Sequence, residues 1–107
     1  MTRGTPKPFI VDLLSEFDRK RIRYCHFKSN DMLHLALTGV GDLDLLVDFD
    51  DVDPFQAILA DRGFFAAIDT LAITTPYVFH YYGLDMDDGQ MIHLHVYFQL
   101  ITGGSIL

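Results

Sequence analysis

The sequence predicts an α/β (α+β) fold in which a small mixed β-sheet carries helices on one face. Three observations predict it. Apolar residues recur at helical spacing near the start of the chain, apolar and polar residues alternate along residues 42–48 and 90–101, and the turn sequence Asp87-Asp88-Gly89 precedes the second of these segments. With 107 residues, half of them hydrophobic, the chain can form one domain and hardly two.

The chain is predicted to begin with a flexible leader and an amphipathic helix. Residues 1–7 mix Gly, Pro and basic residues without periodicity, so we expect a leader there and a single domain over residues 8–107. Pro8 suits the first turn of a helix, and Lys20 and Arg21 suit the last. The residues at helical spacing are Phe9, Ile10, Leu13, Leu14 and Phe17.

A strand, a polar turn and a short helix are predicted next. Residues 21–28 alternate with a period of two, which places Cys25 on an apolar face as a small buried hydrophobe and not as a catalytic thiol. The polar residues at 29–31 break the strand and cap a short helix that residues 38–41 close.

Two further strands and a helix separate this unit from the hairpin. Residues 42–48 are predicted as a strand, residues 54–63 as a helix ended by Gly63, and residues 64–68 as a short strand. Residues 77–86 and 90–101 then pair as a hairpin. The side chains expected to face the helices are Leu43, Leu45, Val47, Ile92, Leu94, Val96 and Phe98.

The polar faces of the predicted strands converge on one side of the sheet. Asp42 and Asp44 lie about 7 Å apart along one strand, close enough to share a hard cation as metal-assisted phosphoryl transfer requires. The spacing alone also fits a solvated acidic face. The residues expected on this side are His26, Lys28, Asp42, Asp44, His80, Tyr82, His93, His95 and Tyr97.

Composition excludes several functions. A formal charge of −7 repels phosphate backbones, so non-specific nucleic-acid binding is not expected. No apolar run approaches the roughly 20 residues of a membrane span. The first residues lack the apolar core and cleavage site expected of a signal peptide. Cys25, the one cysteine, cannot form a disulfide framework, and we expect a cytoplasmic protein with no membrane association.

The strand residues Asp42-Leu43-Asp44-Leu45, preceded by a strand, a polar turn and a helix, resemble the polymerase-beta-like nucleotidyltransferase superfamily. The segments YCHFKSN, GDLDLLVD, FHYYG and HLHVYFQLITGG look like the bacterial nucleotidyltransferase-like domains that are joined to thymidylate-kinase-like modules. The resemblance covers about residues 24–104. It implies that Asp42 and Asp44 bind a divalent metal, usually Mg²⁺, together with a nucleoside triphosphate.

The sequence departs from the family pattern at two places. The Gly-Ser pair that holds phosphate in the family is here Ser29-Asn30, so Lys28, Ser29 and Asn30 are the candidates for nucleotide binding. His93 and His95 stand where a third carboxylate is expected. Because imidazole suits Mn²⁺ or Zn²⁺ better than Mg²⁺, either the metal preference has changed or the activity has been lost.

Three functions follow from these residues. The first is a metal-dependent transfer of a nucleotidyl group from a nucleoside triphosphate to an acceptor that the sequence does not identify. The second is a degenerate, non-catalytic domain that binds nucleotide or a partner chain. The third is a metal hydrolase that uses His80, His93 and His95 with Asp44. Because the chain ends in mid-pattern at 106–107, we also expect missing C-terminal elements and either a homo-oligomer or fusion to a larger protein.

Overall fold

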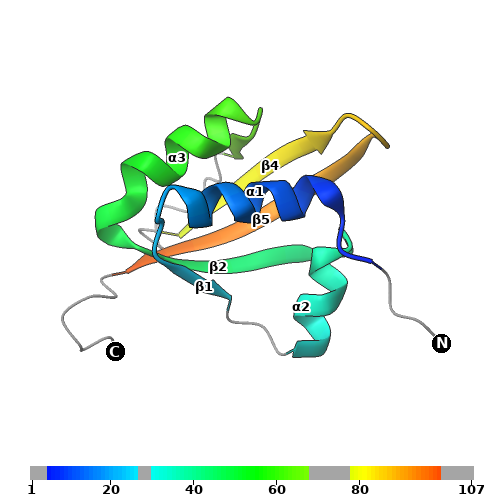
Figure 1. Cartoon of the computed structure of the whole chain (residues 1–107), viewed down its shortest axis with the longest axis horizontal. Coiled ribbons are helices and arrows are strands. Elements are labelled where there is room, and N and C mark those ends of the chain that lie inside the picture. The colour runs from blue at the N-terminus through cyan, green and yellow to red at the C-terminus, as the bar shows by residue number, and fades with distance from the viewer. Residues whose placement is uncertain (1–4, 27–29, 68–77, 100–107) are drawn as a thin grey trace.

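The computed structural model describes residues 5–26, 30–67 and 78–99, which form a mixed sheet with helices packed on it (Figure 1). The predicted α/β class is confirmed. The elements are α1 (Pro8–Arg19), β1 (Tyr24–His26), α2 (Asn30–Leu37), β2 (Asp42–Asp48), a 3₁₀ turn η1 (Phe49–Asp51), α3 (Val52–Asp61), β3 (Phe65–Ala67), β4 (Val78–Asp85) and β5 (Gln90–Gln99).

The sheet has five described strands in the order β1-β2-β5-β4-β3. The central strands β2 and β5 are parallel, and every other neighbouring pair is antiparallel. β4 and β5 form the predicted hairpin, whose turn contains Gly89 at φ 74°, a conformation that glycine adopts without steric cost. Since β2 and β5 lie side by side in register, residues far apart in the sequence meet at the centre of the sheet.

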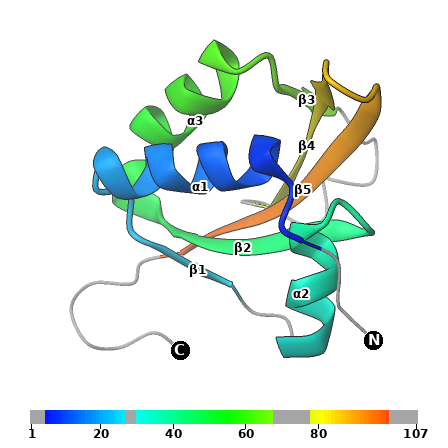
Figure 2. The same ribbon diagram turned by 45° about the vertical axis from the view of Figure 1, so that its right-hand side comes forward.

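Helices α1 and α3 cover one face of the sheet (Figure 2). Their apolar residues recur every three or four positions, and they pack against the alternate apolar residues of β2 and β5, as predicted. The rings of Phe17 in α1 and Phe55 in α3 stack with centroids 4.9 Å apart, and both side chains are fully buried. The same core contains Ile10, Leu13, Leu43, Leu45, Val47, Ile92, Leu94, Val96 and Phe98.

Helix α2 lies beside the first residues of β2 and is joined to the β4–β5 hairpin. Gln90 Nε2 donates to the carbonyl of Gly39, and Lys7 N donates to the carbonyl of Leu37. The Lys7 ammonium pairs with Asp85 at 2.6 Å and also with Asp88 in the hairpin turn. Lys7, the last residue of the expected leader, therefore fixes the start of the domain to the hairpin.

The prediction of which β1 side chains lie on the helix side of the sheet is wrong. In the antiparallel register Tyr24 pairs with Val47 and His26 with Leu45, so both side chains lie on the helix side of the sheet. Tyr24 packs edge-on against Phe17, with ring centroids 5.4 Å apart. Cys25, predicted as a buried hydrophobe, is instead exposed. The reason is that the large Tyr24 ring, with more apolar area than the thiol, fills the space beside α1.

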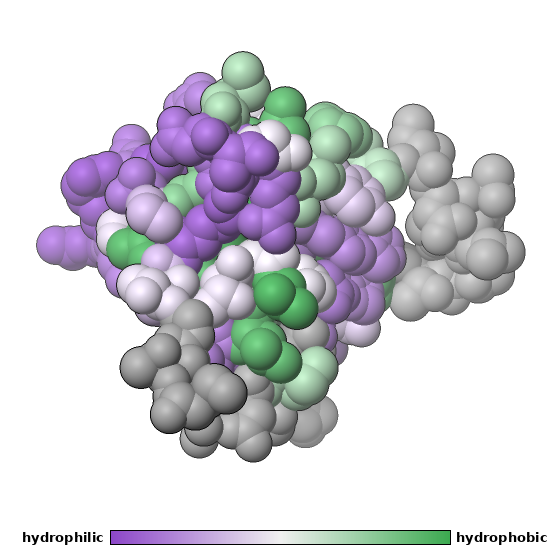
Figure 3. All heavy atoms as spheres, turned by 90° about the vertical axis from the view of Figure 1, so that its right-hand side faces the viewer, coloured by the Kyte–Doolittle hydropathy of each residue, from purple (hydrophilic) through white to green (hydrophobic). Residues whose placement is uncertain are grey.

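None of the helices in the described ranges has the length and apolar character needed to cross a membrane. Figure 3 views the end of the molecule where the hairpin turn and α2 lie, and the apolar side chains that it shows low in the view lie over α2. Met32 and Leu35 in α2, and Val40 shortly after it, are exposed.

Candidate metal centre

The sheet face opposite α1 and α3 carries the polar residues of the central strands, and we call it the polar face. The parallel register places Asp42 beside His93 and Asp44 beside His95. The hairpin register places His80 beside His95 and Tyr82 beside His93. The predicted convergence is confirmed for Asp42, Asp44, His80, Tyr82, His93, His95 and Tyr97.

Asp42, Asp44 and His95 form the tightest group on the polar face. One possible ligand atom from each residue lies within 4.8 Å of those of the other two. His95 Nδ1 is 3.4 Å from Asp44 Oδ1 and 3.9 Å from Asp42 Oδ2. The three side chains are 33%, 21% and 22% exposed, so solvent and ligands reach a site that is also partly shielded. Two carboxylates and one imidazole at this spacing can hold a divalent cation.

His80 and His93 form a second contact beside this group. His80 Nδ1 and His93 Nε2 are 2.8 Å apart, so one ring donates a hydrogen bond and the other accepts it. His80 also stacks on His95, with ring centroids 4.4 Å apart and an interplanar angle of 11°. Tyr82 stacks on His93, and the Tyr97 ring packs against His95 at a tilt of 44°, which extends the row of rings at both ends. The row fixes the orientation of the His95 ring that contacts the two carboxylates.

Burial and the neighbouring carboxylates shift the pKa of His93 in opposite directions. Burial, the largest effect, lowers the pKa of His93 below its usual value, and the neighbouring His80 and His95 act in the same direction. Asp42 and Asp44 raise it, but their effect is smaller in sum. A lowered pKa favours the neutral ring, which is the form that accepts a hydrogen bond or binds a metal.

The predicted site residues divide into three groups. Asp42, Asp44 and His95 come together as predicted, whereas His93 is directed to His80. Lys28 and Ser29 lie outside the described residues, and Asn30 begins α2 with a side chain that lies outside the description too.

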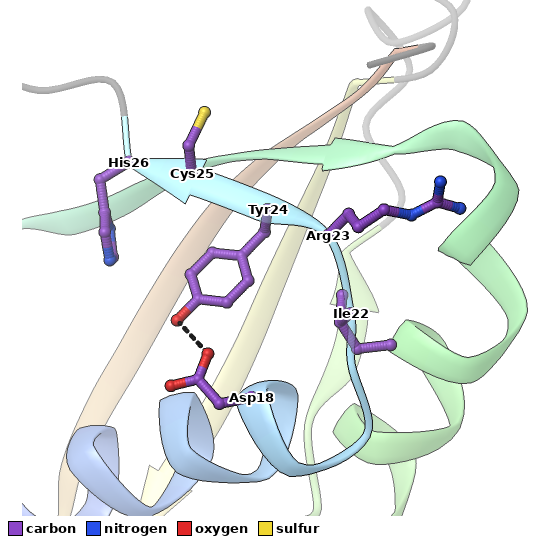
Figure 4. A pocket seen from close by; sticks show the side chains of 6 residues that line it. All are labelled: Asp18, Ile22, Arg23, Tyr24, Cys25 and His26. Carbon is purple, nitrogen blue, oxygen red and sulfur yellow. Dashed lines mark hydrogen bonds between the residues drawn. The ribbon is translucent and has the colours of Figure 1, made fainter. Parts of the chain in front are cut away.

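His26 was expected on the polar face, and this expectation is wrong. His26 and Tyr24 extend toward α1, whereas Cys25 extends the other way (Figure 4). All three residues of β1 line a cavity of about 600 Å³ together with Asp18, Ile22 and Arg23. The Tyr24 hydroxyl lies 3.4 Å from Asp18 Oδ1, and burial raises the pKa of Tyr24 to about 12. Burial also lowers the pKa of His26. His26 therefore belongs to a separate cavity at the edge of the sheet.

The acidic residues at the end of β2 and in η1 make specific contacts. Asp48 caps η1, since its Oδ1 accepts from Asp50 N at 2.9 Å, and its side chain is fully buried. Asp51 accepts hydrogen bonds from the backbone and guanidinium of Arg23. An ion pair thus connects the start of β1 to the start of α3.

Sequence reasoning placed His80 on the polar face but gave it no part in the leading metal site. The hairpin sequence nevertheless indicated which residue lies beside His80. Counting back from the turn pairs Asp85 with Gln90, and the same register pairs His80 with His95. The hairpin therefore sets His80 beside the imidazole of His95.

No protein-family model matches the chain, and a search of curated proteins finds no match.

Proposed function

We propose that this chain is a cytoplasmic nucleotidyltransferase-like domain that binds a nucleoside triphosphate with a divalent metal and transfers the nucleotidyl group to an acceptor. The observation that carries the proposal is the grouping of Asp42, Asp44 and His95. The two carboxylates come from alternate positions of one strand, and the third ligand comes from the parallel neighbour. The resemblance noted in the sequence implies metal binding by Asp42 and Asp44, and it expects the third ligand on the strand that carries His93 and His95.

The donor set suits a divalent cation. Carboxylate oxygens are ligands for Mg²⁺ and Mn²⁺, and an imidazole nitrogen favours Mn²⁺ or Zn²⁺. Because His95 occupies the position of a third carboxylate, we propose that the site has a higher relative affinity for Mn²⁺ or Zn²⁺ than a site of three carboxylates. His80 supports this role by stacking on His95 and restraining its ring.

The chain's own residues would act on the substrate as follows. Asp42 and Asp44 hold the cation, and one of them accepts the proton of the acceptor hydroxyl. That oxygen forms a bond to the α-phosphorus while the bond from the α-phosphorus to the leaving oxygen breaks, and pyrophosphate departs. The bound metal would supply positive charge that orients the triphosphate and stabilises the leaving group.

The test is metal-dependent binding of a non-hydrolysable ATP analogue to the whole chain, measured by calorimetry with Mg²⁺, Mn²⁺ and Zn²⁺. Asp42→Asn and Asp44→Asn each keep the side-chain shape and remove one charge, so the analogue should bind at least about tenfold more weakly. Asp12→Asn removes the same charge from the exposed surface of α1 and should change nothing. Equal binding by all four proteins, or no metal-dependent binding by the parent, would sink the proposal.

Two other functions each have an observation in their favour. His95 in place of a carboxylate favours a non-catalytic domain, and nucleotide binding without turnover would support it. The placement of Asp44, His95 and His80 on three neighbouring strands, with His93 in contact with His80, favours a metal hydrolase. Stoichiometric Zn²⁺ without nucleotide binding would support that hydrolase.

A further inference from the structure

A second cavity lies on the other face of the sheet from the metal centre. It has a volume of about 430 Å³, within the range of sites that bind small organic molecules. It lies between the first turns of the α3 segment and the end of the hairpin strands. We call it the phenylalanine pocket, and its lining residues are Phe49, Asp50, Val52, Asp53, Gln56, Phe79 and Phe98.

The pocket has an aromatic floor and wall. Phe98 is a core residue, and the Phe79 ring packs edge-on against it with centroids 5.5 Å apart. Phe79 and Phe49 are 38% and 40% exposed although they are large apolar side chains. Two partly exposed phenylalanines on one cavity present ring faces and edges to whatever enters it.

The polar part of the lining is acidic. Asp50 and Asp53 are exposed, and the described lining residues include no lysine or arginine. The nearby Arg23 is hydrogen-bonded to Asp51, the residue after Asp50, and lines a different cavity. Gln56 donates its amide N–H to the Tyr81 hydroxyl at 2.8 Å, so the amide is held in one orientation. The rim of the pocket therefore carries negative charge.

We propose that the phenylalanine pocket binds an organic cation, an alkylammonium group whose apolar body lies on the phenylalanine rings. Aromatic rings attract a cation through their quadrupole, and carboxylates form charge-assisted hydrogen bonds with an ammonium group. Charge complementarity selects this occupant over a neutral or acidic one, in a chain whose formal charge is −7. The proposal does not depend on the function of the metal centre.

The test compares three probes of equal chain length on the whole protein by ¹H–¹⁵N NMR titration at pH 7. These are hexylammonium chloride, 1-hexanol and sodium hexanoate. We expect saturable shifts at Phe49, Val52 and Phe98, with hexylammonium binding at least about fivefold more tightly than hexanol, and hexanoate most weakly. The double variant Asp50→Asn/Asp53→Asn should lose the preference for the cation and keep the weak binding of hexanol.

A matched control removes the same charge elsewhere. Asp12→Asn/Asp61→Asn changes two exposed carboxylates outside the pocket and should keep the preference for hexylammonium. Four outcomes would overturn the proposal: shifts that do not saturate, equal binding of hexanol, a preference that survives in the Asp50/Asp53 variant, or its equal loss in the control. Shifts at Phe49 and Phe98 that depend on protein concentration alone would also overturn it, because a second copy would then be the occupant.

Discussion

His95 Nδ1 lies 3.4 Å from Asp44 Oδ1, across the parallel strands β5 and β2. The two residues are paired in the register, so the backbone fixes their separation before any ligand arrives. If the proposed metal binds here, a carboxylate and an imidazole so placed would distinguish between metals by donor type as well as by charge. The choice of metal is therefore the first property to test.

Replacing His95 by aspartate should shift the metal preference toward Mg²⁺. The change exchanges a nitrogen donor for oxygen donors, so we expect the ratio of Zn²⁺ to Mg²⁺ affinity to fall at least about tenfold. Competition calorimetry on the whole chain measures this ratio. Gln99→Asp adds the same charge at an exposed position of β5 and should leave the ratio unchanged. An unchanged ratio in His95→Asp would show that His95 is no ligand.

The ion pair of Asp51 and Arg23 should make part of the folding stability depend on pH. The hydrogen bonds from Arg23 lower the pKa of Asp51 below its usual 3.8. Because the folded state holds the carboxylate charged, the stabilisation is complete above the unfolded pKa and is lost as the pH falls through the folded one. Asp51→Asn should lower the Tm by a few degrees at pH 7, the modest effect of a partly exposed pair.

The difference in Tm between the parent and Asp51→Asn should be constant from pH 5 to 7 and should shrink below pH 3.8. Thermal unfolding followed by circular dichroism across this range measures it. Asp53→Asn, at an exposed carboxylate two residues further along, is the control and should show little difference at any pH. A Tm difference that grows as the pH falls would contradict a lowered pKa of Asp51 in the folded state.

Lys7→Met should destabilise the protein more than Lys20→Met. Lys7 pairs with the buried carboxylate of Asp85, whereas Lys20 is exposed at the end of α1. Without the ammonium, the Asp85 charge stays buried with the hydrogen bond from Asp87 N. Adding Asp85→Asn to Lys7→Met should recover part of the lost Tm. Equal effects of the two single lysine changes would show that the pair contributes nothing.

Gly83→Ala should destabilise the sheet by overpacking. A Cβ atom at Gly83 would come within 2.7 Å of the Phe64 ring, which is closer than packed atoms approach. We expect a loss of about 1–3 kcal/mol in the free energy of unfolding, measured by urea denaturation. Phe64→Leu should lower the cost of Gly83→Ala when the two are combined. Additive losses would indicate that the ring is not the obstacle.

The exposure of Cys25 should make its thiol reactive in the folded protein. Ellman's reagent should modify one thiol per chain without denaturant, since Cys25 is the one cysteine. The rate should lie within about tenfold of that in urea, because no unfolding is needed to reach the sulfur. Protection by several orders of magnitude in the folded state would mean that Cys25 is buried, as its sequence context suggested.

The sequence by itself determined most elements and the two sides of the central strands. In β2 and β5 every second residue is strongly apolar. Because only that set of side chains can fill a core, the alternation allows one assignment of the two faces of each strand. That reasoning placed Asp42, Asp44, His93 and His95 on the face opposite the helices before any contact was known. The turn at 87–89 likewise determined the hairpin, because its residues allow the chain to reverse.

Only the tertiary structure decided which histidine meets the carboxylates and which face β1 turns to the core. His93 and His95 share a face, and their contacts differ because His80, from the neighbouring strand, stacks on both rings and hydrogen-bonds the first. In β1 both sets of alternate side chains mix apolar and polar character. Alternation alone therefore does not decide which set faces the helices. Packing against Phe17 selected the one that buries the Tyr24 ring and leaves Cys25 exposed, because the ring removes more apolar surface from water.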